Sequence, residues 1–313
     1  MSHLLELFQP DFLLRDALVA SVLVGFICPL VGVYFVLRRM IFLGVALPQL
    51  SAAGIAFAFL AYRMIVGVHQ HEEPNERLLA MAGSFGFTLA GLLVLAALER
   101  RGRETVEARI GTTYALAAAA TILFLAADPY GEAQMVNLLK GDIVATSGAN
   151  LSLLAWTLGA VALALLAFRK ELLLVSFDRD LAVVFGKRAG LWDTLLYLLI
   201  GITISLGVMT AGPLVTFGFL VVPPLTARLL VRRMLAFSLT AAALGATTAF
   251  AGFYAAYRLD LPLGPAEVAV AAVLLVVVGA GRGLVSLRRA GRRSSSVSGA
   301  HAPRDDNEHR HVG

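Results

Sequence analysis

The chain contains nine long apolar stretches, separated by short polar segments that carry most of its charge. Most of these stretches approach the roughly 20 residues that a helix needs to cross the hydrocarbon core of a bilayer. Inside lipid a helix satisfies all of its backbone hydrogen bonds within one segment. The sequence therefore predicts an all-α, polytopic transmembrane helical bundle of eight to nine spans. The expected spans are 16–37, 41–66, 78–98, 110–127, 150–168, 191–210, 213–231, 234–257 and 264–286.

Composition divides the chain into two parts. Apolar residues make up 58% of the whole and charged residues 15%, against about 25% charged in an ordinary soluble domain. The last segment, 288–313, is instead basic, rich in Ser and Gly, and contains three histidines. We expect a transmembrane domain over 1–287 and a disordered cytoplasmic tail over 288–313, since such a composition buries too little apolar surface to fold.

Lys and Arg are unevenly distributed between the two sets of loops. With the N-terminus outside, 21 of the 26 Lys and Arg residues lie in the inner segments. Because cytoplasmic loops carry the excess of basic residues, this predicts an N-out, C-in topology with 170–190 in the cytoplasm. The same rule explains the net charge of +5 by contact with membrane lipid, without nucleic acid as a partner.

Residues 177–186 form a short charged segment within this apolar chain. Asp178 lies near its start. Ala182 and Gly186 are four residues apart, so a helix would place them on one face. That face would be smooth and able to pack closely, with charges beside it. We interpret the segment as a cytoplasmic docking site for a soluble partner.

Two acidic residues lie at or near predicted spans, where a charge is costly and often functional. Glu267 enters the last span shortly after Gly264. It is either part of a translocation path or an interfacial charge that favours the helix dipole. Asp142 lies near a helix start and is either a path residue or a helix cap.

Prolines in the second and seventh expected spans are candidates for a helix break. Pro48 lies in the second span, and Pro223 and Pro224 lie in the seventh. We expect both helices to kink or break there, which is tolerated only where protein or a cavity covers the backbone. Gln49 and Ser51 follow Pro48. An amide in a broken helix offers its carbonyl to a cation or bonds a neighbouring helix, so these residues are candidates for a path and its gate.

The loop after the second span holds His69, His71 and Glu72, which we place on the outer face. Imidazole and carboxylate groups bind divalent cations, so this cluster is a candidate for gathering a metal ion. A solvated loop is the simpler interpretation.

Motifs of ATP-hydrolysing and other hydrolytic enzymes are missing from the sequence. It contains no G-x-x-x-x-G-K-[ST] phosphate loop, no H-E-x-x-H and no G-x-S-x-G. We therefore expect a protein that is not an enzyme and that leaves any ATP hydrolysis to a partner subunit.

Several short elements, in order, resemble those of the ABC-3 family, the membrane permeases of ABC importers for zinc, manganese or iron. The resemblance covers roughly 15–286. The elements are RRMIFLG at 38–44, LKGDI at 139–143, SFD at 176–178 with Leu181, Ala182 and Gly186, AGPL at 211–214 with VVPPLTAR at 221–228, and DLPLGP at 260–265.

This resemblance implies a type II ABC importer permease in a bacterial plasma membrane. It makes the 177–186 segment the coupling helix that docks on a cytoplasmic ABC ATPase, with Asp178, Ala182 and Gly186 as the matching positions. It further implies ATP and Mg²⁺ on the ATPase, a second permease copy or paralogue, an extracytoplasmic metal-binding protein, and a divalent metal ion as substrate. No cofactor is expected on this chain itself.

One part of the sequence departs from the family pattern. The run from Gly44 to Gly54 keeps both glycines, but Val45 and Gln49 replace the usual acid and histidine of the second span. Since a neutral amide is a weak ligand for transition metals, the identity of the transported metal does not follow from the resemblance. We hypothesise that Glu267 partly replaces the lost ligands.

Two other classes of protein stay open at this level. An ion-driven secondary transporter would use Glu267 and Asp142 as coupling groups. A related membrane subunit with a different or lost substrate would keep the fold without the metal path.

Overall fold

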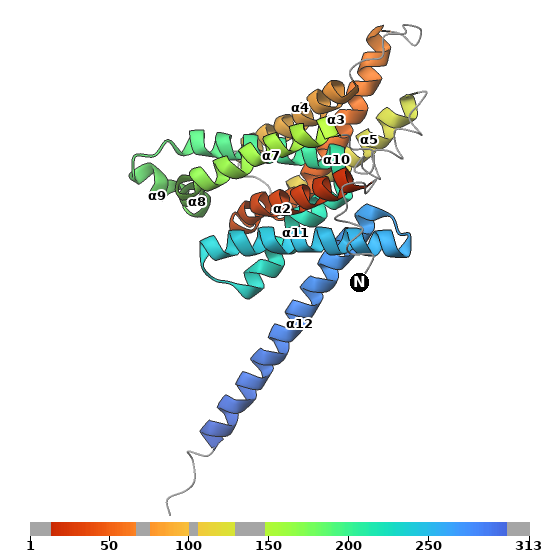
Figure 1. Cartoon of the computed structure of the whole chain (residues 1–313). Coiled ribbons are helices and arrows are strands. Elements are labelled where there is room, and N and C mark those ends of the chain that lie inside the picture. The colour runs from red at the N-terminus through yellow and green to blue at the C-terminus, as the bar shows by residue number, and fades with distance from the viewer. Residues whose placement is uncertain (1–13, 67–75, 100–105, 129–147, 299–313) are drawn as a thin grey trace, which may run out of the picture.

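A computed structural model describes residues 14–66, 76–99, 106–128 and 148–298 (Figure 1). Every regular element within these ranges is a helix, which confirms the all-α prediction. Eight of the helices are long and apolar enough to cross a membrane, which confirms a multi-pass protein. The helices are α2 (Arg15–Leu37), α3 (Leu43–Val66), α4 (Glu76–Glu99), α5 (Val106–Ala127), α7 (Gly148–Ala167), α8 (Arg169–Phe177), α9 (Arg179–Val184), α10 (Ala189–Leu230), α11 (Met234–Leu259) and α12 (Leu263–Ser298).

Helix α10 contains two spans. It has 42 residues, so a straight helix would be about 63 Å long, roughly twice the hydrocarbon thickness. Gly212 interrupts it with φ 80° and ψ 166°, a conformation open almost only to glycine. Asp193 near one end bonds Arg38, and Arg228 near the other lines a groove with Arg38. The helix therefore doubles back at Gly212, and its two arms are the predicted sixth and seventh spans.

Neither of the two spans breaks at its prolines, whereas a kink there stays a prediction. Helix α3 continues through Pro48, and the second arm of α10 continues through Pro223 and Pro224. All three prolines are buried, so neighbouring helices cover the carbonyls that proline leaves without a donor. The interruption lies instead at Gly212, where only the backbone freedom of glycine permits the turn.

Helix α2 is the central element of the bundle and packs on α7, α10 and α11. Its contacts depend on glycine, which lets helix backbones approach closely. Gly32 lies against the carbonyl of Leu220, whose usual donor is missing because residue 224 is proline. Gly25 and Gly245 of α11 likewise lie against each other's carbonyl oxygens.

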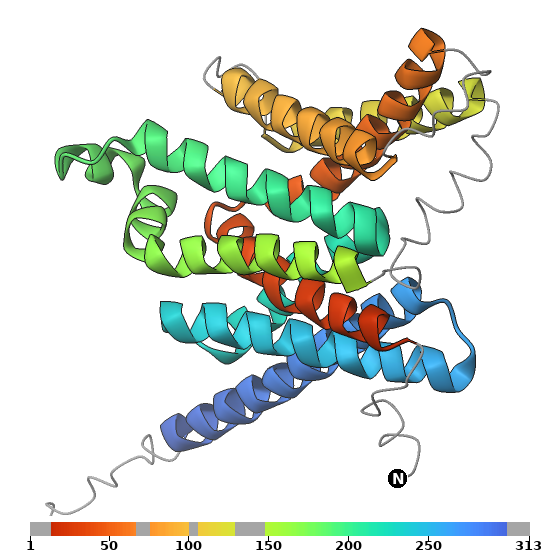
Figure 2. The ribbon, with the colours of Figure 1, turned by 45° about the horizontal axis from the view of Figure 1, so that its top comes forward.

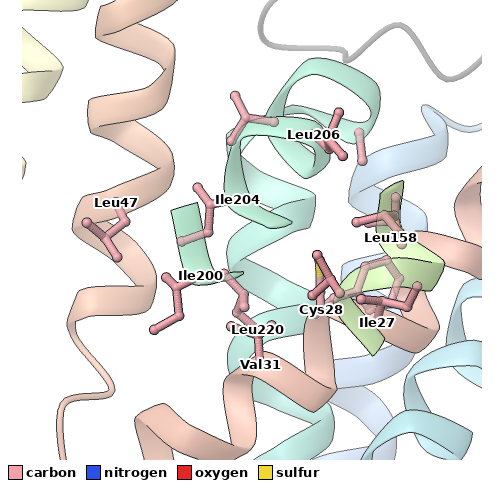
Figure 3. Close-up of a cluster of buried hydrophobic side chains, with 14 of the residues drawn as sticks. Ile27, Cys28, Val31, Leu47, Leu158, Ile200, Ile204, Leu206 and Leu220 are labelled. Carbon is pink, nitrogen blue, oxygen red and sulfur yellow. The ribbon is translucent and has the colours of Figure 1, made fainter. Parts of the chain in front are cut away.

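The helices form two groups around this centre. Figure 2 shows α3, α4 and α5 on one side and α11 and α12 on the other, with α2, α7 and α10 between them. The buried apolar cluster draws side chains from several of these helices, including Ile27, Leu47, Leu158 and Ile204 (Figure 3). Helices α3 and α4 join the rest through α10.

Helix α12 extends beyond the bundle (Figure 1). It continues to Ser298, across the domain boundary expected at 287. Residues 299–313 lie outside the described residues. The boundary and the disorder proposed for the tail stay predictions.

Candidate functional site

The basic loops gather at one end of the bundle. Arg38 and Arg39, which follow α2, line one groove together with Arg228 and Arg232 from the end of α10. Arg179 of α9 lies at the same end, within 3.5 Å of Asp193. The predicted inner segments after α2, α7 and α10 therefore share one face; that this face is cytoplasmic stays a prediction.

Helices α8 and α9 form a helical hairpin at this end (Figure 1). Asp178 separates them in an extended conformation, and its Oδ1 accepts a hydrogen bond of 2.9 Å from the backbone N–H of Leu181. An aspartate at this position caps the free N–H groups of the following helix. Asp178 thus sets the turn that positions α9.

The expectation that Ala182 and Gly186 share a helix face is wrong. Helix α9 ends at Val184, and Gly186 follows it with φ 72°. The N–H of Lys187 bonds the carbonyl of Ala182, so Gly186 holds the left-handed position that ends the helix. Ala182 is fully buried and packs within this chain against Val175 and the start of α10.

The exposed side chains of the hairpin are large and apolar. Val183 is 58% exposed, Val184 81% and Phe185 66%. We call these three residues the α9 apolar face. A contiguous apolar group beside charged residues favours an interaction site, so this face is a candidate docking surface. Gly186 beside it is also exposed, and the coupling role of Asp178, Ala182 and Gly186 stays a prediction.

Ionic contacts fix the hairpin to the membrane helices. The Arg38 guanidinium, just after α2, bonds Asp193 of α10 at 2.7 Å and donates to the Ser176 hydroxyl of α8 at 3.1 Å. Arg179 of α9 reaches the other oxygen of Asp193 at 3.5 Å. One network of polar contacts therefore joins the hairpin to the end of α2 and to α10.

Ser51, a candidate path residue of α3, lies in the contact with α4. The hydroxyl oxygens of Ser51 and Ser84 are 2.5 Å apart, and both side chains are buried. Gln49 is half-buried on the same helix. Ser51 therefore serves helix packing in this conformation.

Glu267 lies in a different contact. It is fully buried between α12, α2 and α11, and its Oε1 accepts a hydrogen bond of 2.5 Å from the Ser21 hydroxyl. Gly252 of α11 packs against its backbone. Within the described residues its Oε2 has no hydrogen-bond partner. The structure does not bring Glu267 together with Gln49 or Ser51.

Four other candidate residues cannot be placed. Asp142, His69, His71 and Glu72 lie outside the described residues. Among the residues that the structure does describe, no three His, Cys, Asp or Glu side chains come together as a metal site.

Replacing Glu267 by glutamine separates a packing role from a role in transport. We expect Glu267→Gln to keep uptake of each metal within about twofold of wild type, because the amide preserves the shape and the Ser21 contact. Glu267→Ala should instead lower the free energy of unfolding by about 2–4 kcal/mol, since it leaves a cavity. Metal uptake and thermal unfolding are the measurements. A tenfold loss of uptake by a folded glutamine variant would place the carboxyl on the path.

The sequence did not predict which residues contact Glu267, Ser51 and Arg38. Ser21, Ser84 and Gly252 come from helices distant in sequence, and small residues in apolar helices are the only signal that they leave. Arg38 belongs to a recognised motif, but its ion pair with Asp193 joins residues 155 apart.

The fold defines a class of protein, a multi-pass membrane protein with a helical hairpin at one end of its bundle. The ABC 3 transport family model matches residues 10–281. The chain belongs to this family, which confirms that it is a transporter subunit and not an enzyme.

Relatives and solved structures agree with this assignment. The chain is 28% identical over 274 residues to a probable iron transport system membrane protein of Haemophilus influenzae, covering 88% of this chain and 91% of the relative. It is 26% identical over 271 residues to the manganese transport system membrane protein MntC of Halalkalibacterium halodurans, covering 84% and 85%. PsaBC from Streptococcus pneumoniae, solved in complex with Fab, has the same fold with a TM-score of 0.74 at 21% identity, covering 88% and 94%.

Proposed function

We propose that this chain is the permease subunit of an ATP-driven ABC importer for a divalent metal ion, with manganese or iron as the first candidates and zinc as the third. The observation that carries the proposal is the family match over 10–281, together with relatives that are named for iron and manganese transport. The substrate is the cargo and not a resident cofactor.

The hairpin supports the proposed partner. A cytoplasmic ABC ATPase carrying ATP and Mg²⁺ would bind the α9 apolar face, whose side chains are 58–81% exposed. Its closure would push the hairpin, and the Arg38 network would carry the movement into α2 and α10. A second permease copy or paralogue and an extracytoplasmic binding protein complete the proposed assembly, in the bacterial plasma membrane with the N-terminus outside.

The side chains of α3 that could bind a metal indicate which metal is transported. Gln49 and Ser51 offer only oxygen, and Val45 offers no ligand. Oxygen ligands suit Mn²⁺ better than Zn²⁺, which favours imidazole and thiolate. We propose that Gln49 lines the path, and Asp142 stays a second candidate.

Competition between metals tests the cargo. We expect the complete complex, reconstituted in vesicles, to accumulate Mn²⁺ or Fe²⁺ in the presence of ATP, with equimolar Zn²⁺ reducing this uptake by less than about half because the α3 donors are oxygens. Vesicles that contain the permease without its ATPase are the control. Stronger inhibition by Zn²⁺ than by unlabelled Mn²⁺ and Fe²⁺ would reverse the proposed order, and accumulation of none of the three would remove the metal assignment.

A further inference from the structure

A groove at the basic end of the bundle is lined by four arginines that the proposed coupling mechanism leaves without a common role. Arg38 and Arg39 come from the end of α2, and Arg228 and Arg232 from the end of α10. No acidic side chain lines it among the described residues. We call it the arginine groove, and four cations facing one hollow require an anion.

Three of these cations are available to a ligand. Arg38 is held by Asp193 and Ser176. Arg39, Arg228 and Arg232 are exposed, and no ion pair or hydrogen bond of their side chains occurs within the part of the chain that the structure describes. The groove therefore offers a fixed guanidinium and three free ones to one anionic group.

The backbone of Arg39 has φ 57°. It occupies the left-handed position that ends α2, where the N–H of Met40 bonds the carbonyl of Phe35. Glycine ordinarily fills this position, and a residue with a Cβ is strained there. Backbone strain of this kind often occurs at ligand-binding positions.

Apart from Ser176, the rest of the lining is apolar. Val231, Met234 and Phe237 form the wall next to α11, and Phe237 is buried against α2 and the second arm of α10. The groove thus opens where three spanning helices begin or end, with cations on one side and apolar side chains on the other. That combination matches a phosphate headgroup followed by its glycerol and acyl chains.

We infer that the arginine groove binds the phosphate headgroup of an anionic phospholipid at the cytoplasmic surface of the membrane. Basic pockets between spanning helices recognise such headgroups, and anionic lipids concentrate at this surface. An acidic segment of the ATPase is the competing occupant. The lipid is favoured because most of the lining comes from the ends of spanning helices. Ser176 and Phe177 of α8 also line the groove, but no residue of α9, the proposed ATPase contact, does. The inference rests on the membrane location of the chain and not on its cargo.

Native mass spectrometry of the purified full chain in detergent, titrated with phosphatidylglycerol or phosphatidylcholine, tests the site. We expect wild type to bind phosphatidylglycerol at least tenfold more tightly than phosphatidylcholine. The double variant R228Q/R232Q should bind phosphatidylglycerol about thirtyfold more weakly, from the usual contribution of two basic residues. The control R188Q/R233Q removes two exposed charges from the same end without touching the groove, and its affinity should stay within about threefold of wild type.

Four results would overturn the inference. Equal binding of the two lipids would mean that the groove does not recognise the anionic headgroup. Equal losses in the two double variants would show that net charge alone attracts the lipid. Full displacement of phosphatidylglycerol by millimolar inorganic phosphate would show a site for free phosphate, and loss of ATPase association with unchanged lipid binding in R228Q/R232Q would assign the groove to the partner.

Discussion

Replacing Val184 and Phe185 together by aspartate is expected to abolish association of the chain with its ATPase and, with it, metal uptake. These side chains are 81% and 66% exposed on the α9 apolar face. Burying one such side chain in an interface contributes about 1.5–3 kcal/mol, so losing two should weaken binding at least a hundredfold. Co-purification of the two subunits and ATP-dependent uptake measure the effect.

The control for this change lies at the opposite end of α11. Leu261 is 49% exposed in the connection between α11 and α12, so Leu261→Asp makes the same type of substitution away from the hairpin. It should leave association unchanged. Full ATPase binding by the folded Val184→Asp/Phe185→Asp variant would show that the docking surface lies elsewhere.

The substitution Gly32→Ala is expected to lower the free energy of unfolding by about 3 kcal/mol, at the upper end of the usual cost of overpacking. A Cβ on Gly32 would overlap the carbonyl oxygen of Leu220 and lie 2.8 Å from its carbonyl carbon and 2.9 Å from the Pro224 ring. Backbone and a proline ring cannot move aside as a flexible side chain can, so α2 and α10 must separate. Thermal unfolding of the purified chain in detergent measures the effect.

Gly86 supplies the matched control for the packing prediction. A Cβ there meets nothing within 4 Å, and alanine is the better helix former at both sites. Gly86→Ala should therefore leave the unfolding temperature unchanged or slightly raised. If Gly32→Ala unfolds at the wild-type temperature as well, the close crossing of α2 and α10 does not hold the bundle together.

Apolar length and charge distribution were sufficient to predict the spans. They located both arms of α10, because each arm has its own apolar run and a polar boundary. They failed at the prolines, since sequence shows the missing donor at Pro224 but not the glycine of α2 that packs over the freed carbonyl. A proline whose freed carbonyl is covered by a neighbouring helix therefore does not break its own helix, although the sequence alone suggests a break.

The sequence predicted a short helix within residues 177–186, but not where that helix ends. The spacing of Ala182 and Gly186 suggests one helix face, yet a six-residue helix ends before Gly186. Whether a small residue faces a partner or its own chain depends on tertiary packing, here on Val175. For Glu267 the sequence left a path residue and an interfacial charge open, and its pairing with Ser21 joins residues 246 apart and leaves no local signal.

The central claim is that ATP hydrolysis by a docked partner drives metal across this permease. Uptake of Mn²⁺ and Fe²⁺ into vesicles containing the complete complex, with ATP supplied on the side of the ATPase and without any ion gradient, tests it most directly. We expect accumulation that stops without ATP and in the Val184→Asp/Phe185→Asp variant. Accumulation that follows a proton or sodium gradient and ignores ATP would contradict it and identify a secondary transporter.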